Sequence, residues 1–393
     1  MTEPNIVLPC AAGAVIRRLY ESGFEAFAVG GCVRDSIMGR IPNDWDVTTS
    51  ARPEETLAVF RDEPFRAVPT GIAHGTVTVV YSGEPIEVTT YRVDGEYSDC
   101  RHPDSVSFTS RLPDDLGRRD FTVNAMAYSD ASGIVDPFGG RGDIERRLIR
   151  CVGEPEKRFS EDALRILRAL RFASVLGFEI EEKTALAAEK LSPLLNHVSR
   201  ERVASELSKL IRGMNAAEVI RNFSRVISRV IPVDPEEIAA ASEIIGKLRG
   251  ESLPLLLSAL LYGKDAFSLL KGLRFDNRTI SRVVSILSFD GADGYVGAKK
   301  LCAAVGSDVA RDIQKLSAAM GRISPESVGF IDEIGRRVEC VSVKQLKIGG
   351  GEIMNLGIEP KRIGAVLESL LSGVIEGKIP NEYERLCEAA KRL

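Results

Sequence analysis

A pair of glycines near the start of the chain is placed as an anion-binding turn would be. Gly30 and Gly31 follow the apolar run 24–29, which is typical of a short strand, and precede the segment 33–38, which is typical of a helix. A helix start leaves backbone N–H groups free to face phosphate oxygens, and glycine permits the closest approach of a ligand to the backbone. The two glycines therefore indicate a triphosphate site.

Two aspartates follow in a segment that alternates polar and apolar residues. In a strand over 44–49, Asp44 and Asp46 would point to one face, because side chains alternate with a period of two. Mg²⁺ prefers oxygen ligands and often completes its shell with substrate phosphates, which suits two carboxylates beside a phosphate-binding turn. Alone, a glycine pair is most often a turn and an Asp-x-Asp most often a loop. In the order strand, turn, helix, strand, they favour nucleotidyl transfer with bound Mg²⁺.

A third carboxylate, Glu87, lies in the β-like run 86–91. It completes an acidic triad with Asp44 and Asp46 if this run pairs with the strand that carries them. The alternative, which fits the spacing equally well, is a solvent-facing glutamate on an edge strand. The pairing of the two strands therefore decides whether Glu87 can belong to the catalytic carboxylates.

Two arginines precede a helix-like stretch further along the chain. Arg118 and Arg119 carry guanidinium groups, which suit phosphate and ribose oxygens, and Asn124 follows within the stretch. The alternative is that Asp120 or Thr122 caps a helix and that both arginines are solvated. Spacing alone slightly favours this second interpretation.

The segment 160–172 is predicted to be one helix. Ser160 would be its N-cap, and Glu161 and Asp162 would lie in the first turn, where negative charge is stabilised. Basic residues at every third position alternate with leucines, so one side of the helix would bury leucines and the other would present positive charge. These basic residues are Arg165, Arg168 and Arg171. Asp162 and Arg165, three positions apart, would be neighbours on the helix surface.

A carboxylate that accepts hydrogen bonds and a guanidinium that donates them together match one kind of base edge. Cytosine and adenine present an amino group beside an unprotonated ring nitrogen, whereas uracil and guanine present a carbonyl and a ring N–H. Asp162 and Arg165, pointing together into a cleft, would therefore select C and A without a nucleic-acid template. The alternative for this pair is a surface ion pair, which contributes little to stability.

Composition limits the classes of protein to consider. A chain of 393 residues exceeds what one hydrophobic core usually supports, so several domains are expected. Seven cysteines without a Cys-x-x-Cys pair indicate reduced thiols, not a disulfide framework or a zinc site. No run has the length of a membrane span and no signal peptide is recognisable, so a cytoplasmic location is expected. The net charge of −4 argues against indiscriminate nucleic-acid binding but allows a local basic surface.

The pattern of residue types changes once along the sequence. Residues 1 to about 140 mix short β-like runs with turns rich in Gly, Pro and Asp, whereas the pattern beyond about 158 is helical to the end. An α+β head followed by an all-α remainder is therefore predicted. Helix-breaking residues cluster near 232–235, 289–294 and 349–351, where the remainder is expected to subdivide.

Six motifs, in order, resemble those of class II tRNA nucleotidyltransferases, the CCA-adding enzymes of the polymerase β-like superfamily, and of the related bacterial poly(A) polymerases. The motifs are 30–35 with 44–46, 97–108, 118–125, 136–140, 161–165 with Arg168, and 199–203 with Glu206. The resemblance implies a nucleotidyltransferase head with a mixed sheet, a neck that recognises the base, a body, and a tail that binds tRNA, the last three all helical. The implied bounds are 1–145, 146–212, 213–335 and 336–393.

The resemblance also implies roles for the residues above. The metal-binding catalytic carboxylates would be Asp44 and Asp46, and the strand pattern described above adds Glu87 as a candidate third catalytic carboxylate. The nucleotide-binding residues would be Gly30, Gly31, Arg34, Arg119, Asp120, Asn124, Asp162, Arg165 and Arg168, of which Asp162 and Arg165 would contact the base edge. The implied cofactor is Mg²⁺, and the implied partners are tRNA, CTP and ATP.

Three alternatives share most of these motifs. A bacterial poly(A) polymerase usually carries a strongly basic extension, whereas this chain is acidic. A partial enzyme that adds only CC or only A would keep nearly every motif, although the intact segment 97–108, a loop used in the switch from C to A addition, disfavours the CC-only form. A dehydrogenase and a P-loop ATPase are excluded because their glycine motifs are missing. No protein partner is implied other than a second copy of the chain, in a homodimer.

Overall fold

The computed structural model describes residues 6–95 and 106–393. The chain forms two compact units, Met1–Pro235 and Glu236–Leu393. Most of the segment 97–108 lies outside the described residues. Its last three residues form the short strand β7 (Val106–Phe108), which pairs with β6 (Arg92–Asp94).

The N-terminal unit is built around a seven-stranded mixed sheet. In order across the sheet, the strands are β3 (Phe65–Gly71), β4 (Thr76–Tyr81), β5 (Glu84–Thr90), β2 (Asp46–Thr49), β1 (Ala26–Val29), β8 (Ala127–Ser129) and β9 (Gly133–Val135). β2 and β5 run parallel, and every other neighbouring pair is antiparallel. A separate parallel pair joins β10 (Leu148–Ile149) to β11 (Glu179–Ile180).

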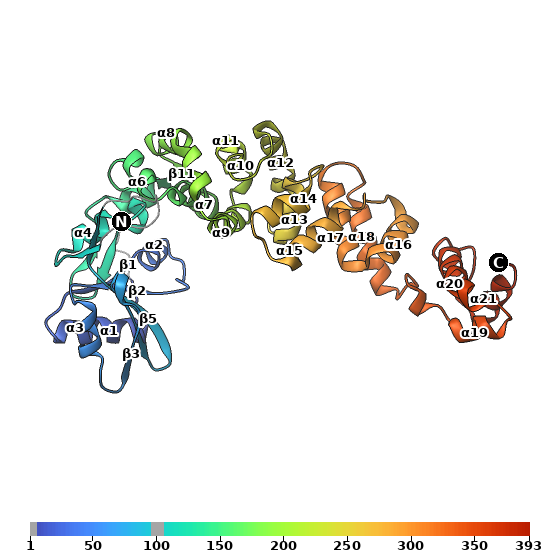
Figure 1. Cartoon of the computed structure of the whole chain (residues 1–393), viewed down its shortest axis with the longest axis horizontal. Coiled ribbons are helices and arrows are strands. Elements are labelled where there is room, and N and C mark those ends of the chain that lie inside the picture. The colour runs from blue at the N-terminus through green and yellow to red at the C-terminus, as the bar shows by residue number, and fades with distance from the viewer. Residues whose placement is uncertain (1–5, 96–105) are drawn as a thin grey trace. The chain divides into compact units, whose positions relative to one another are not determined.

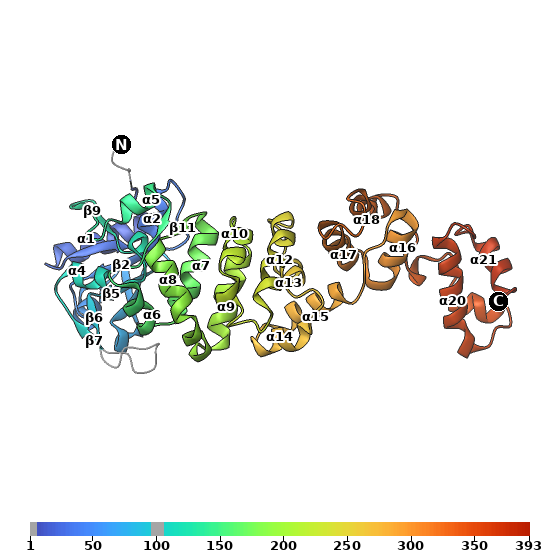
Figure 2. The same ribbon diagram turned by 90° about the horizontal axis from the view of Figure 1, so that it is seen from above.

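Helices cover the sheet and form the rest of the N-terminal unit. They are α1 (Cys10–Glu21), α2 (Gly31–Ile37), α3 (Pro53–Val59), α4 (Leu112–Gly117), α5 (Gly140–Glu145), α6 (Pro155–Glu161), α7 (Leu164–Leu176), α8 (Glu182–Leu191), α9 (Arg200–Ile211), α10 (Ala216–Asn222) and α11 (Ser224–Ile227). Short 3₁₀ turns are η1 (Ile72–His74), η2 (Thr122–Asn124) and η3 (Ser192–His197). α7 packs against α9, and α6 packs against α8 (Figure 2).

The two faces of the sheet have different roles. One face packs against α1 and α3 (Figure 1) and forms the main core of the unit. Val47 on β2 and Val88 on β5 are buried in this core. Asp46 and Glu87, one position earlier in each strand, lie on the opposite face because side chains alternate along a strand. Burial of the valines therefore directs both carboxylates away from the core.

The predicted helix over 160–172 is wrong at its start. Ser160 lies inside α6, which ends at Glu161, and α7 begins only at Leu164. Asp162 between them has an extended backbone, with φ −138° and ψ 104°. Its carboxylate accepts the N–H of Leu164 at 3.0 Å and so starts a new helix. The sequence contains neither Gly nor Pro at this break, which is why the pattern suggested one continuous helix.

The C-terminal unit is helical throughout its regular elements. They are α12 (Pro235–Lys247), α13 (Leu253–Leu260), α14 (Ala266–Gly272), α15 (Asn277–Leu287), α16 (Gly294–Val305), α17 (Ser307–Ala319), α18 (Glu326–Arg336), η4 (Val343–Gln345), α19 (Gly350–Asn355), α20 (Pro360–Ile375) and α21 (Tyr383–Ala390). The predicted fold class, an α+β head followed by a helical remainder, is confirmed, although the two-residue strand β11 lies within that remainder. The finer division into neck, body and tail stays a prediction. Within the described ranges, no helix is both long and apolar enough to cross a membrane.

Candidate active site

Three carboxylates lie near one another beside the start of β2. Asp46, the first residue of β2, lies directly opposite Glu87 in the parallel register of the two strands. Asp44 precedes β2 by two residues, so it lies in the adjoining loop and not on the strand as predicted. All three line an open hollow of about 1190 Å³. The strand pairing on which the assignment of Glu87 depended is therefore present.

The neighbouring acids perturb the ionisation of Asp46. Desolvation by the surrounding protein, followed by the negative charges of Asp44 and Glu87, raises the pKa of Asp46 to about 6, and the charge of Arg119 opposes this shift. Mutual repulsion of this kind is relieved when a cation binds between the carboxylates.

The donor set suits a hard divalent cation whose coordination is shared with a substrate. Nowhere in residues 6–95 and 106–393 do three His, Cys, Asp or Glu side chains converge on one metal position. Mg²⁺ is commonly held by one or two carboxylates together with waters and substrate phosphates, and does not require such a protein cage. Asp44 and Asp46 therefore fit Mg²⁺ bound jointly with a triphosphate.

The glycine turn brings the backbone close to an arginine. Gly30 precedes α2 with φ +82°, a conformation that favours glycine. Its N–H donates to the carbonyl of Met126, and a Cβ built at this position would lie 3.0 Å from Nη1 of Arg119. Gly30 is thus required for the turn and for the approach of the Arg119 guanidinium.

Four of the sequence-predicted nucleotide-binding residues form one chain of hydrogen bonds. The Arg34 guanidinium on α2 donates to the side-chain carbonyl of Asn124 in η2. The Asn124 amide donates to Asp120 at 3.1 Å, and the other oxygen of Asp120 accepts from Nε of Arg168 on α7 at 2.8 Å. The predicted alternative, a capped helix with solvated arginines, is wrong, because η2 is a single 3₁₀ turn. These hydrogen bonds join the head to α7, the first long helix beyond it.

Asp120 is an ionised anchor for this chain of hydrogen bonds. Burial opposes its ionisation, but the charge of Arg168 and hydrogen bonds from Asn124 and Arg168 outweigh this, and the pKa of Asp120 falls to about 2. A carboxyl whose pKa is lower in the folded than in the unfolded state stabilises the fold above its ordinary pKa. That contribution is lost as the pH falls toward the folded-state pKa.

Asp120→Asn should lower the free energy of unfolding at pH 7 by about 2 kcal/mol, the amount linked to the lowered pKa of Asp120, because it leaves the Arg168 guanidinium without its buried counter-charge. The difference from the wild type should begin to shrink below pH 3.8, as Asp120 becomes protonated in the unfolded chain. Denaturant titrations between pH 7 and pH 3 measure both effects. Asp130→Asn, at an exposed carboxylate, is the matched control and should be nearly neutral. A pH-independent difference would contradict the ionised state of Asp120.

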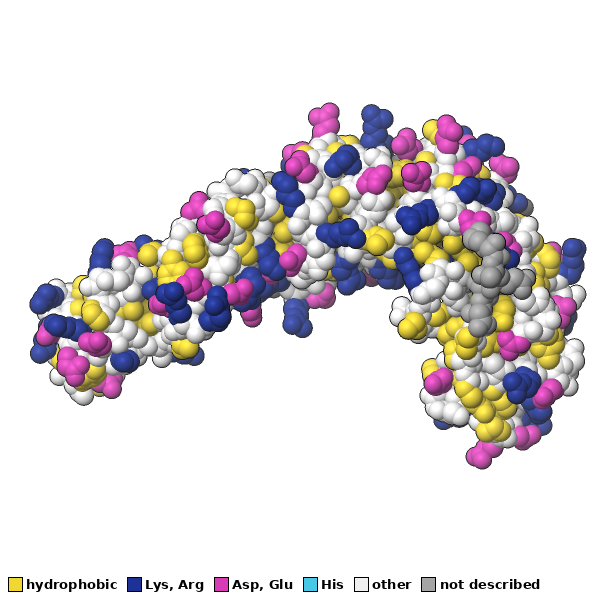
Figure 3. All heavy atoms as spheres, turned by 180° about the vertical axis from the view of Figure 1, so that it is seen from behind, with side chains coloured by type: hydrophobic (Ala, Val, Ile, Leu, Met, Phe, Trp, Pro, Cys, Tyr) yellow, Lys and Arg dark blue, Asp and Glu magenta, His cyan; other side chains and the backbone are white. Residues whose placement is uncertain are grey.

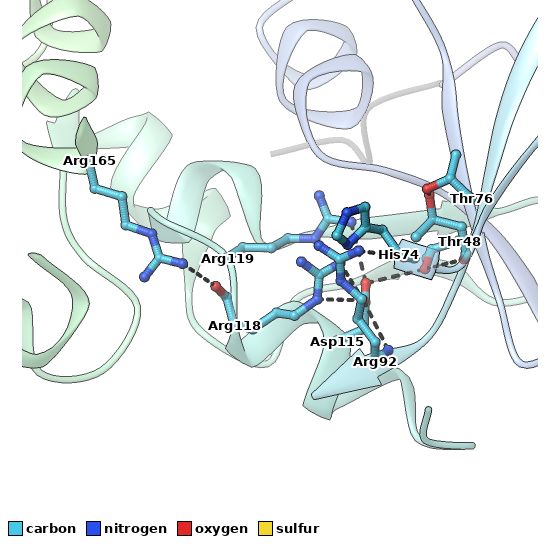
Figure 4. Close-up of polar contacts among 9 residues, drawn as sticks. Thr48, His74, Thr76, Arg92, Asp115, Arg118, Arg119 and Arg165 are labelled. Carbon is cyan, nitrogen blue, oxygen red and sulfur yellow. Dashed lines mark hydrogen bonds and ion pairs between the residues drawn. The ribbon is translucent and has the colours of Figure 1, made fainter. Parts of the chain in front are cut away.

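A buried aspartate that sequence reasoning missed holds the two adjacent arginines. Asp115 on α4 is 0% exposed. It accepts from Arg118 at 2.8 and 3.0 Å, from Arg119 at 3.3 Å and from the Thr48 hydroxyl on β2 at 3.2 Å (Figure 4). Burial opposes its ionisation, but the charges and hydrogen bonds of Arg118 and Arg119 keep the pKa of Asp115 below its ordinary value. The signal available in the sequence was the spacing of three and four residues between Asp115 and the two arginines, Arg118 and Arg119.

Asp162 and Arg165, which were predicted to contact the base edge, lie between α6 and the first turn of α7. The Asp162 carboxylate accepts from Arg202 of α9 at 2.8 Å. Arg165 donates to Glu161 at 2.7 Å and to the backbone carbonyl of Arg118 at 3.1 Å (Figure 4). The arginines of α7 are thus paired with acids. They do not form the unpaired, positively charged side of the helix that the sequence pattern predicted. Arg202, which sequence reasoning left without a role, is a partner of Asp162.

Three family profiles match separate parts of the chain. They are the poly(A) polymerase head domain at residues 26–150, the probable RNA and SrmB-binding site of polymerase A at 177–225, and domain 2 of the tRNA nucleotidyltransferases at 251–390. The CCA-adding enzyme of Geobacillus thermodenitrificans is 35% identical over 387 residues, which cover 95% of this chain and 94% of the relative. The chain belongs to the CCA-adding enzyme family. A CCA-adding enzyme of Limosilactobacillus fermentum is 34% identical over 399 residues, with coverage of 97% and 96%.

Solved structures of CCA-adding enzymes have the same fold. The Bacillus stearothermophilus CCA-adding enzyme in complex with CTP has a TM-score of 0.78 and 31% identity, covering 97% of this chain and 96% of that one. The Thermotoga maritima CCA-adding enzyme complexed with tRNA has a TM-score of 0.69 and 23% identity, covering 96% and 93%, and it shows the fold alone. As a CCA-adding nucleotidyltransferase, the chain carries its carboxylates on the head domain of this family.

Proposed function

We propose that the chain adds C, C and A in turn to the 3′ end of tRNA, using CTP and ATP and releasing pyrophosphate. The observation that carries this proposal is the parallel register that sets Glu87 beside Asp46, next to Asp44. Membership of the CCA-adding family supports the choice of acceptor. The Bacillus stearothermophilus relative described above as a complex with CTP supports CTP as a substrate.

The reaction is an in-line displacement at the α-phosphorus. Asp44 and Asp46 would hold Mg²⁺, which when bound lowers the pKa of the attacking 3′-hydroxyl and offsets charge on the departing pyrophosphate. Gly30, Gly31 and Arg34 would bind the triphosphate. The residues that hold its ribose and phosphates would be Arg119, Asp120, Asn124 and Arg168. Little covalent chemistry is required of the protein, since positioning and charge stabilisation supply most of the rate.

The order of the strands supports binding of the RNA 3′ end and of the triphosphate on opposite sides of β2. β2 lies between β1, which leads into the glycine turn, and β5, which carries Glu87. Described residues that line the hollow include all three carboxylates, Thr78 and Pro85 on the β5 side, and Ser36 and Gly39 at the end of α2, but none of the proposed triphosphate contacts. Attacking and leaving oxygens lie on opposite sides of the phosphorus in such a displacement. We therefore expect the RNA 3′ end in the hollow and the triphosphate at the glycine turn.

Selection of the base would fall to Asp162 and Arg165, at the start of α7. Their present partners, Arg202 and Glu161, hold the acceptor and donor groups in place near the Arg118 carbonyl. Recognition of the RNA itself would rely on shape and backbone. Basic and acidic side chains are interspersed over the face shown in Figure 3, which favours scattered phosphate contacts over one large basic patch.

The decisive assay uses tRNAs that end before CCA and two residues into CCA, each supplied with CTP, ATP or both. Complete CCA addition requires incorporation of C, C and A on the first substrate and of one A on the second. Long A tails would identify a poly(A) polymerase instead. Arrest after CC, or action only on the CC-ending tRNA, would identify a partial enzyme.

A further inference from the structure

A single aromatic ring lies among three arginines, of which Arg34 and Arg168 belong to the proposed nucleotide site. The guanidinium carbon of Arg171 lies 3.7 Å from the centre of the Phe172 ring, and those of Arg34 and Arg168 lie 5.2 and 5.3 Å from it. All three are within the range in which a cation is attracted to the face of a ring. Phe172 is 6% exposed, so water screens these contacts weakly.

The ring is held in place by its own helix and by the head. Phe172 lies four positions after Arg168 on α7, a spacing that makes the two side chains neighbours. The ring of Phe121, which precedes η2, meets it edge to face, with centres 5.8 Å apart and an interplanar angle of 78°. Arg34 reaches the same ring from α2. Phe172 thus joins elements that are far apart in the sequence.

Three like charges around one ring repel one another, and each is balanced by an acid. Arg34 pairs with Asp35, Arg168 with Asp120, and Arg171 with Glu206 at 2.7 Å. Burial, together with the charges of Arg168 and Arg34, lowers the pKa of Arg171, although Glu206 and Asp120 oppose this. The acids neutralise the charge from the outside of the cluster, and the electron-rich ring face fills its centre.

We propose that Phe172 is a positioning residue for nucleotide binding, which keeps the guanidinium groups of Arg34 and Arg168 in the geometry that receives the triphosphate. The inference rests on the proposed function, because these arginines bind the nucleotide only if the chain transfers nucleotides. A ring that holds them before the substrate arrives reduces the ordering that binding must otherwise impose. Removing its electron-rich face should therefore weaken nucleotide binding more than it slows the chemical step.

A series of fluorinated phenylalanines at position 172 isolates the electrostatic role of the ring from its shape. Each added fluorine weakens the attraction for cations with little change in size. The KM for CTP should rise stepwise to about tenfold in the trifluoro form, with kcat changed by less than about threefold. Phe172→Leu, which removes the ring, should show at least the same rise. Calorimetric titration with CTP provides the affinity directly and does not require turnover.

Phe159 is the matched control for the series. Its ring on α6 is 0% exposed, and among the described residues no guanidinium lies over it. The same fluorinated residues at position 159 should leave KM and CTP affinity unchanged. A CTP affinity that stays constant across the series at position 172, with or without a lower melting temperature, would overturn the inference. A wild type that binds CTP without transferring it would instead overturn the proposed function.

Discussion

Asp46→Asn should abolish nucleotide addition, with a fall in rate of at least about 10³-fold, while the protein remains folded. The substitution keeps the size of the side chain but removes the charge through which Asp46 would share a cation with Asp44. The melting temperature should not fall, because the substitution removes one of three mutually repelling carboxylates. Primer-extension assays with labelled CTP measure the rate, and thermal melts without metal measure the stability.

Glu84→Gln is the matched control for this experiment. Glu84 is an exposed carboxylate that lines the same hollow but begins β5 three residues before Glu87. It should retain most of the wild-type rate. Asp44→Asn should behave like the Asp46 variant. An undiminished rate in either aspartate variant would remove that residue from the catalytic assignment.

Asp162→Ala should reduce the preference for CTP over UTP by about 10- to 100-fold. The carboxylate would accept from the amino group of cytosine, and mismatched buried polar groups cost about 1–3 kcal/mol each. The same change should reduce the preference for ATP over GTP. Competition assays with paired nucleotides measure the ratio of kcat/KM values for the correct and incorrect base.

Asp162 also caps α7, so a second variant separates its two roles. Asp162→Asn keeps an oxygen for the N–H of Leu164, while its amide group can donate to the carbonyl of uracil. This variant should shift toward UTP while the cap of α7 is kept, although the ion pair with Arg202 is lost. Glu156→Ala, at an exposed acid paired with Lys190, is the control. Unchanged selectivity in both Asp162 variants would exclude this residue from base recognition.

The motifs predicted the catalytic strands well, because their signals are local. The apolar run before Gly30, the glycine turn, and the alternation that buries Val47 are all consequences of a few neighbouring residues. Local alternation also indicated which face of the strand Asp46 would occupy. The break at Asp162 was not predicted, because an aspartate can start a second helix without any Gly or Pro to mark it.

Partners from distant parts of the chain could not be predicted in the same way. Asp115 and Thr48 are 67 residues apart yet share a hydrogen bond. Asp120 meets Arg168 across 48 residues, in an ion pair whose carboxylate is buried. Spacing along a helix or strand contains no information about such contacts, since they depend on how elements pack.

The sequence by itself indicated the proposed chemistry, because the glycine turn and the Asp-x-Asp, on which the proposed phosphate and metal site depends, are formed by neighbouring residues. It also determined the family and the α+β order of the chain. The tertiary structure alone decided that Glu87 lies beside Asp46, since parallel pairing joins strands 41 residues apart by register and not by proximity in sequence. It also decided that Arg168 and Arg171 of α7 gather with Arg34 around Phe172, because only the packing of the folded chain brings α2 and α7 to one ring.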